Sequence, residues 1–219
     1  MGSRSEADKE ITSGSKKLQS VSRRDVLTGT VASIACAFVP TSSIRLARAS
    51  SSNEVLTSVE RQSLEAVVSR IIPAGPDGPG AIEAGCARYI ALALQDAYQS
   101  VRKTYSSGLA ALDAHARSSG GKPFAALSAA EQDKILLDFE QNIPVGGYGD
   151  SATFFELVRR HTLEGMFGDP SYGGNANFAG WELIGYPGPR MFVSSEMQKM
   201  DAKIPRSRVT AKQLAHGYH

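Results

Sequence analysis

Histidine and cysteine are the residue types that most readily bind metals or act as acids, bases and nucleophiles. The chain has four histidines, His115, His161, His216 and His219, and two cysteines, Cys36 and Cys86. A di-iron site in a helical bundle needs two Glu-x-x-His pairs on facing helices. Here only His161 and Glu164 stand three residues apart, in the reverse order and without a second pair. We therefore expect no metal site, and a capping or buried structural role for His161.

Motifs for nucleophilic catalysis and phosphate binding are also missing from the sequence. There is no Gly-x-Ser-x-Gly elbow, and Cys86 lies in an Ala/Gly-rich stretch with no histidine nearby. The glycine-rich stretch 146–149 lacks the Lys-Ser/Thr ending of a phosphate-binding loop. The sequence therefore predicts no catalytic residue and no cofactor-binding residue in this chain.

The paired Arg23 and Arg24 directly precede an apolar run over residues 26–39. This arrangement indicates a twin-arginine export signal, which directs folded proteins across a membrane. The run of 14 residues is shorter than the roughly 20 that a transmembrane helix needs, and it fits the apolar region of a signal peptide. Ala47 and Ala49 give the small-x-small pattern of a cleavage site. We therefore predict a signal peptide over residues 1–49 and a mature domain over 50–219.

Two other interpretations of this leader stay open. One is an ordinary secretory signal in which two arginines happen to be adjacent. The other takes Cys36, which follows Ala35, as the attachment site of a lipid. If the leader is removed, Cys86 is the single cysteine of the exported part, either as a buried thiol or as one half of an intersubunit disulfide.

The charge of the predicted mature part is close to zero. The leader has eight Lys/Arg against four Asp/Glu, which leaves 16 against 18 in residues 50–219. A nucleic-acid-binding protein normally has a clustered basic excess, so this class is excluded. No apolar run after the leader approaches the length of a transmembrane helix. About 170 residues remain, which is enough for one domain with a single core.

Apolar residues at three- and four-residue spacing predict an all-α domain of about five helices. Thr57 with Glu60, and Ser128 with Glu131, form capping boxes at two of the helix starts. The expected helices cover about residues 58–72, 81–98, 100–117, 129–141 and 151–166. No segment shows the sustained alternation of a β-strand.

From Gly168 to Pro189, glycine, proline and aromatic residues are interleaved. Loops of this length without regular structure are usually functional or bound to a partner. The polar tail from Arg190 to His219 is expected to be extended over a partner or loosely held.

The segment from Phe154 to Asn175 resembles the signature of the gluconate 2-dehydrogenase subunit 3 family. Its most specific part is the string Gly-Asp-Pro-Ser-Tyr-Gly-Gly-Asn over residues 168–175. The stretch 180–188, from Gly-Trp to Tyr-Pro-Gly, and the upstream stretch 71–85 are similar to the same family. The resemblance spans roughly residues 56–189.

The resemblance implies a small, cofactor-free subunit of a membrane-associated periplasmic sugar or sugar-acid dehydrogenase. The large subunit of such a complex is a flavoprotein of the glucose-methanol-choline type with FAD, and a multihaem cytochrome c usually carries the electrons onward. The small subunit supplies the twin-arginine signal with which the flavoprotein is exported. It reaches the membrane only through these partners, and the large subunit selects the substrate.

Exposed tyrosine and tryptophan side chains are rigid anchors at protein interfaces. We therefore expect Tyr172, Trp181 and Tyr186 to contact the partner, with Arg190 as a polar contact; packing within the loop is the alternative for each. Asp169 and Asn175, beside turn glycines, are expected to cap or brace the loop.

Two alternative functions remain at this point. The chain could be an exported enzyme with an activity of its own, or a stand-alone envelope binding protein or lipoprotein.

Overall fold

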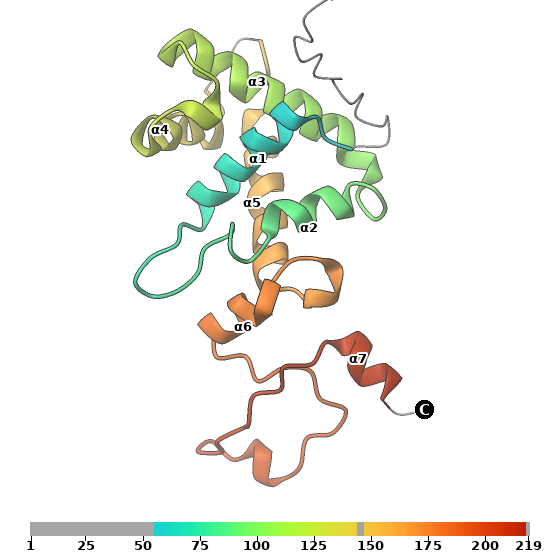
Figure 1. Ribbon diagram of the computed structural model, residues 1–219. Helices are drawn as coiled ribbons and strands as arrows, with labels where there is room; N and C mark the ends of the chain where they lie inside the picture. The colour runs from blue at the N-terminus through green and yellow to red at the C-terminus, as the bar shows by residue number, and fades with distance from the viewer. Residues whose placement is uncertain (1–54, 144–146, 218–219) are drawn as a thin grey trace, which may run out of the picture. The chain divides into compact units, whose positions relative to one another are not determined.

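Helices are the regular elements of residues 55–143 and 147–217, the part of the chain that the computed structural model describes (Figure 1). They are α1 (Ser58–Ile71), α2 (Cys86–Ala93), α3 (Arg102–Gly120), α4 (Ala129–Glu140), α5 (Ser151–Phe167), α6 (Ala179–Leu183) and α7 (Ala211–His216). No β-strand occurs in these ranges, so the prediction of an all-α fold is confirmed. The predicted leader lies outside the described residues, together with Arg23, Arg24, Cys36, Ala47 and Ala49.

Both predicted capping boxes are present and begin their helices where expected. At α1 the Glu60 amide donates to Thr57 Oγ1 at 3.2 Å, and the Thr57 amide donates to Glu60 Oε2 at 2.7 Å. Ser128 and Glu131 exchange the same pair of bonds at the start of α4. Each box satisfies two backbone donors that a helix start leaves unpaired, and a capping side chain contributes about 1 kcal/mol.

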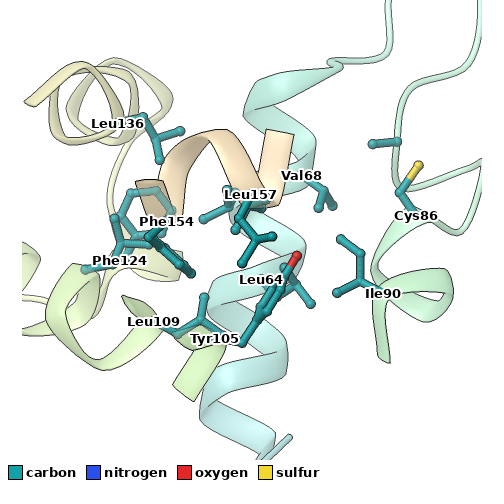
Figure 2. Packing of buried hydrophobic residues seen from close by; sticks show 14 of the residues in the cluster. Leu64, Val68, Cys86, Ile90, Tyr105, Leu109, Phe124, Leu136, Phe154 and Leu157 are labelled. Carbon is teal, nitrogen blue, oxygen red and sulfur yellow. The ribbon is translucent and has the colours of Figure 1, made fainter. Parts of the chain in front are cut away.

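Helix α5 lies at the centre of the packing and contacts α1, α2, α3, α4 and α6. Figure 1 shows α2 and α4 flanking it. One face of α5 is buried along its whole length, at Ser151, Phe154, Leu157, Val158, His161, Thr162, Gly165 and Met166. Leu64 of α1, Ile90 of α2, Leu109 of α3 and Leu157 of α5 meet in the core (Figure 2). Packing in the core therefore fixes the position of α5, and α5 carries the polar side chains His161 and Glu164.

The second predicted helix is wrong at both ends. Helix α2 covers only Cys86–Ala93, because Gly85 takes a left-handed conformation (φ 72°) directly before it. After Ala93 the chain forms turns, and the Tyr98 amide donates to the Ala93 carbonyl at 2.7 Å. The apolar spacing of residues 81–98 was therefore read as one helix where the chain forms a short helix between two turns.

Two short helices were not predicted. Helix α6 lies inside the glycine-aromatic segment, and α7 lies in the tail. The tail helix has its own capping box, formed by Thr210 and Gln213. This signal was available in the sequence, since Thr-x-x-Gln is a recognised form of the motif.

Candidate functional site

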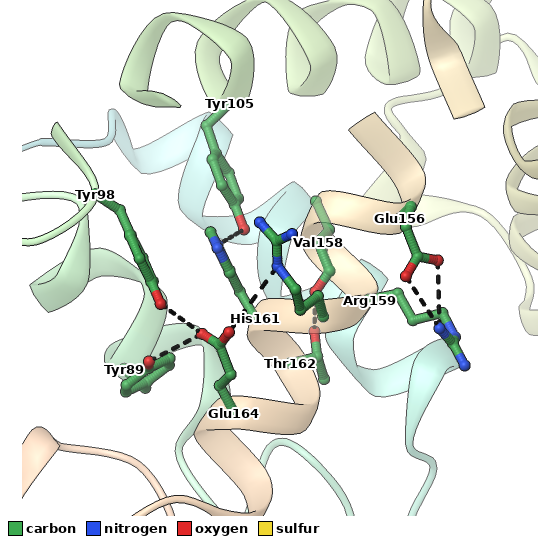
Figure 3. A network of polar contacts seen from close by, with 10 residues as sticks. Tyr89, Tyr98, Tyr105, Glu156, Val158, Arg159, His161, Thr162 and Glu164 are labelled. Carbon is green, nitrogen blue, oxygen red and sulfur yellow. Dashed lines mark hydrogen bonds and ion pairs between the residues drawn. The ribbon is translucent and has the colours of Figure 1, made fainter. Parts of the chain in front are cut away.

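A polar network on α5 joins His161 and Glu164 to tyrosines from the α2–α3 region (Figure 3). The Tyr105 hydroxyl lies 3.0 Å from His161 Nδ1. The Tyr98 ring stacks on the buried imidazole, with centroids 4.2 Å apart and planes 1° apart. Glu164 Oε2 accepts hydrogen bonds from the hydroxyls of Tyr98 at 3.0 Å and Tyr89 at 3.1 Å. One turn of α5 thus fixes three tyrosine rings.

The electrostatics of this network keep its rings neutral. Burial lowers the pKa of His161; the negative charge of Glu164 opposes this shift and the positive charge of Arg160 adds to it. Burial also raises the pKa of Tyr89, Tyr98 and Tyr105, and the Glu164 carboxylate raises all three further. The tyrosine hydroxyls therefore stay protonated and available as donors, and the imidazole stays uncharged near neutral pH. The network therefore holds the aromatic rings in place without burying a charge on the imidazole or on a phenol.

Helix α2 can approach α5 closely because of Gly165. A Cβ atom at this position would lie 3.1 Å from Cys86 Cα and 3.1 Å from the Tyr89 ring, tighter than ordinary packing allows. This close approach brings the Tyr89 hydroxyl within reach of Glu164, one residue before Gly165.

A groove of about 370 Å³ opens beside two of these tyrosines. We call it the tyrosine groove; it is lined by Tyr89, Leu92, Ala93, Asp96, Ala97, Tyr98 and Tyr172. Tyr172 is 69% exposed and Leu92 is 40% exposed. Because the hydroxyls of Tyr89 and Tyr98 are held by Glu164, the rings in the wall cannot rotate freely away. The groove is thus largely apolar and pre-formed, with one carboxylate at Asp96.

Asn175 braces the loop that carries Tyr172. It is fully buried and has a left-handed backbone conformation (φ 44°). Its backbone amide donates to the Gly165 carbonyl at 2.6 Å, and its side-chain Nδ2 donates to the Gly168 carbonyl at 2.8 Å. Its Oδ1 accepts the Gly180 amide at 2.8 Å. One side chain therefore ties the end of α5, the loop and the start of α6 together.

Asp169 links the same loop to the C-terminal helix. Its Oδ1 accepts the Ser171 amide at 2.9 Å, and its Oδ2 accepts the Ala211 amide at the start of α7 at 2.7 Å. Burial opposes ionisation of this carboxyl, but the hydrogen bonds from Ala211 and Ser171 outweigh it and lower the pKa of Asp169. The prediction that Asp169 and Asn175 cap or brace the loop is confirmed.

The four residues predicted to contact a partner do not form one cluster. Tyr172 stands exposed on the tyrosine groove. Trp181 is buried, and its indole donates to the Phe167 carbonyl at 2.8 Å. Tyr186 is 40% exposed and packs edge-on against Trp181, with centroids 4.9 Å apart. Trp181 of α6 therefore packs against the end of α5 inside the chain, and it supports the exposed Tyr186.

Arg190, the predicted polar contact, is engaged within the chain. Its Nη2 donates to the Pro205 carbonyl. Its Nε is buried and has no hydrogen-bond partner among the described residues. The side chain thus closes a loop of the tail and does not project outward.

Cys86 is a free thiol at the start of α2, fully buried in the core. Burial raises its pKa to about 12. A thiol that is both inaccessible and protonated cannot form a disulfide with another subunit unless α2 moves. Of the two interpretations of Cys86, the structure favours the buried thiol.

Within 55–143 and 147–217, no three His, Cys, Asp or Glu side chains lie together as metal ligands. None of the helices in these ranges is both long and apolar enough to span a bilayer.

The sequence did not identify Tyr89, Leu92 and Tyr98 as site residues. No motif marks them, because their relation to Glu164 and Tyr172 arises only when α2 packs on α5. The sequence marks Glu164 by its residue type and its spacing from His161, and this does not predict its tyrosine partners.

The fold and the site define a small all-α protein with a pre-formed, largely apolar aromatic groove. Residues 58–188 match the model of the family gluconate 2-dehydrogenase subunit 3, and the chain belongs to this family. The match begins at the start of α1 and ends after α6, so it contains the whole tyrosine groove but not α7. Neither the curated proteins nor the solved structures that were searched gave a match.

Proposed function

We propose that this chain is a non-catalytic small subunit that binds, stabilises and co-exports a flavin-dependent dehydrogenase. Its family describes a subunit of a gluconate 2-dehydrogenase, which implies partner subunits. The partner in this proposal is a flavoprotein of the glucose-methanol-choline type that holds FAD. A cytochrome c subunit with haem is a further member, and the complex sits on the periplasmic side of the inner membrane.

The observation that carries the proposal is the exposed Tyr172 above the tyrosine groove. Its loop is held by the buried Asn175 through three hydrogen bonds. A large aromatic side chain on a braced loop loses little conformational entropy on binding, which makes it an efficient anchor. The groove beside it offers apolar surface that a partner side chain can fill.

The export role follows from the chemistry of the partner. A flavin is inserted in the cytoplasm, so the flavoprotein must cross the membrane already folded. The twin-arginine signal predicted at Arg23 and Arg24 serves this purpose. A partner without such a signal can then cross while bound to this chain.

Exchange of Arg23→Lys together with Arg24→Lys tests the escort role. We expect flavin-linked dehydrogenase activity to disappear from the periplasm and the folded flavoprotein to stay in the cytoplasm. The matched control is Arg45→Lys, a change of the same kind outside the pair, which should leave export intact. An active flavoprotein in the periplasm of the double variant would contradict the escort role.

A further inference from the structure

A loop of the tail is closed at its neck and stands outside the family match. We call residues 188–207 the C-terminal loop; it lies between α6 and α7 (Figure 1). The Ser207 amide donates to the Pro187 carbonyl at 2.7 Å, and Arg190 donates to the Pro205 carbonyl. Just after the neck, Arg208 pairs with Glu182 of α6. Since the family match ends at residue 188, this loop is additional to the matched region.

The C-terminal loop exposes its large apolar side chains. Met191, Phe192 and Val193 are consecutive and exposed, and Phe192 is 78% exposed. Met200, later in the same loop, is fully exposed, and none of the four belongs to the hydrophobic core. A contiguous run of exposed large apolar residues marks an interaction surface.

The tail also has the opposite charge from the rest of the predicted mature chain. Residues 190–219 contain six Lys/Arg against two Asp/Glu, a net charge of +4. Residues 50–189 contain ten Lys/Arg against sixteen Asp/Glu, a net charge of −6. The exposed cations Lys199, Lys203 and Arg206 lie in the same loop as the apolar run. The loop also holds two exposed anions, Asp201 and Glu196, and Glu196 pairs with Lys199 at 3.8 Å. The loop therefore combines an exposed apolar run with a net positive charge, four Lys/Arg against two Asp/Glu in residues 188–207, and its electrostatic complement is an anionic surface.

We propose that the C-terminal loop binds the surface of an anionic lipid bilayer. Met191, Phe192 and Val193 enter the headgroup region, and the surrounding lysines and arginines contact lipid phosphates, as in interfacial anchors. Lysine is depleted from protein–protein interfaces, whereas at a bilayer its stem covers apolar surface and its ammonium reaches the headgroups. The combination thus favours a bilayer over a protein partner. The proposal differs from the expectation that this chain reaches the membrane only through its partners.

Flotation with lipid vesicles tests the proposal on the full mature chain, with any subunits that it carries. The probes are vesicles containing phosphatidylglycerol and vesicles of phosphatidylcholine alone. We expect binding to the anionic vesicles, weakened by high salt, and little binding to the neutral ones. Met191→Ser combined with Phe192→Ser should lower the bound fraction about tenfold. Lys203→Gln combined with Arg206→Gln should lower it on anionic vesicles and reduce its salt dependence.

The matched control is Leu137→Ser, which changes a similarly exposed apolar residue on α4 and should leave vesicle binding unchanged. Absence of binding to the anionic vesicles, or equal binding of the Met191/Phe192 variant, overturns the proposal. It is also overturned if that variant binds vesicles normally but loses a co-purifying subunit, because the loop is then a protein contact.

Discussion

At the residue scale, His161 shows how far the sequence can predict the role of a single polar side chain. His161 and Glu164 have the residue types of metal ligands, but the structure gives each a different set of tyrosine partners. The imidazole is buried between Tyr98 and Tyr105, and its Nδ1 shares a hydrogen bond with the Tyr105 hydroxyl. The expectation of a buried polar histidine is confirmed, whereas its partners could not be predicted because they lie more than 50 residues away in the sequence.

The lowered pKa of His161 makes stability depend on pH. The unfolded chain binds a proton on this histidine near pH 6.5, whereas the folded chain binds it only at lower pH. Acidification therefore favours the unfolded state, and the free energy of unfolding falls as pH drops below about 6.5. For one group the slope is at most about 1.4 kcal/mol per pH unit. Urea unfolding between pH 7 and pH 5, roughly the window before carboxylates titrate, measures it.

In the His161→Gln variant, the contribution of His161 to the slope of the free energy of unfolding against pH should be lost. The control His115→Gln should keep this contribution. His115 is a half-buried histidine of α3 whose Nε2 lies 3.3 Å from Asp138. An unchanged slope in His161→Gln would show that the buried imidazole does not control the pH response.

At the scale of elements, local signals predicted helix starts well and helix extents poorly. The capping boxes at Thr57 and Ser128 act through bonds within four residues, so the sequence alone locates them. The shortness of α2 depends instead on the left-handed conformation that Gly85 takes, which a glycine permits but does not require, and on contact with α5, which no local pattern contains. The tyrosine groove was missed for the same reason, since it lies where α2 meets the loop after α5.

Asn175 offers a test of how firmly these elements are joined. Asn175→Ala removes two side-chain hydrogen bonds, leaves the buried Gly180 amide and the partly buried Gly168 carbonyl without this partner, and keeps an unfavourable positive φ. We expect a loss of about 3–4 kcal/mol in the free energy of unfolding, measured by urea denaturation.

The control is Asn177→Ala, which has a similar φ of 55° but an exposed side chain. It should cost only about 1 kcal/mol, the backbone part of the effect. Equal losses in the two variants would mean that the hydrogen bonds of Asn175 contribute nothing measurable.

At the scale of the whole chain, the family match and the remaining tail carry different surfaces. The matched residues 58–188 contain the tyrosine groove, and the tail adds the basic, apolar C-terminal loop. In our proposals the groove holds a protein and the loop meets lipid, so the two can be tested independently. The loop beside the groove is tied to α5 by Asn175, and the C-terminal loop is closed by the hydrogen bond between Ser207 and Pro187.

The most direct test of the account is co-purification of a flavoprotein with Leu92→Ser and with Leu137→Ser. The two leucines are 40% and 47% exposed on helices, but only Leu92 lines the tyrosine groove. Flavin absorbance per mole of tagged chain is the measurement, with unfolding of each variant measured in parallel. We predict that Leu92→Ser lowers the retained flavin about tenfold at unchanged stability and that Leu137→Ser retains it fully. Equal retention of flavin by the two variants, or its absence from the wild-type chain, would contradict the claim that this groove holds a flavoprotein.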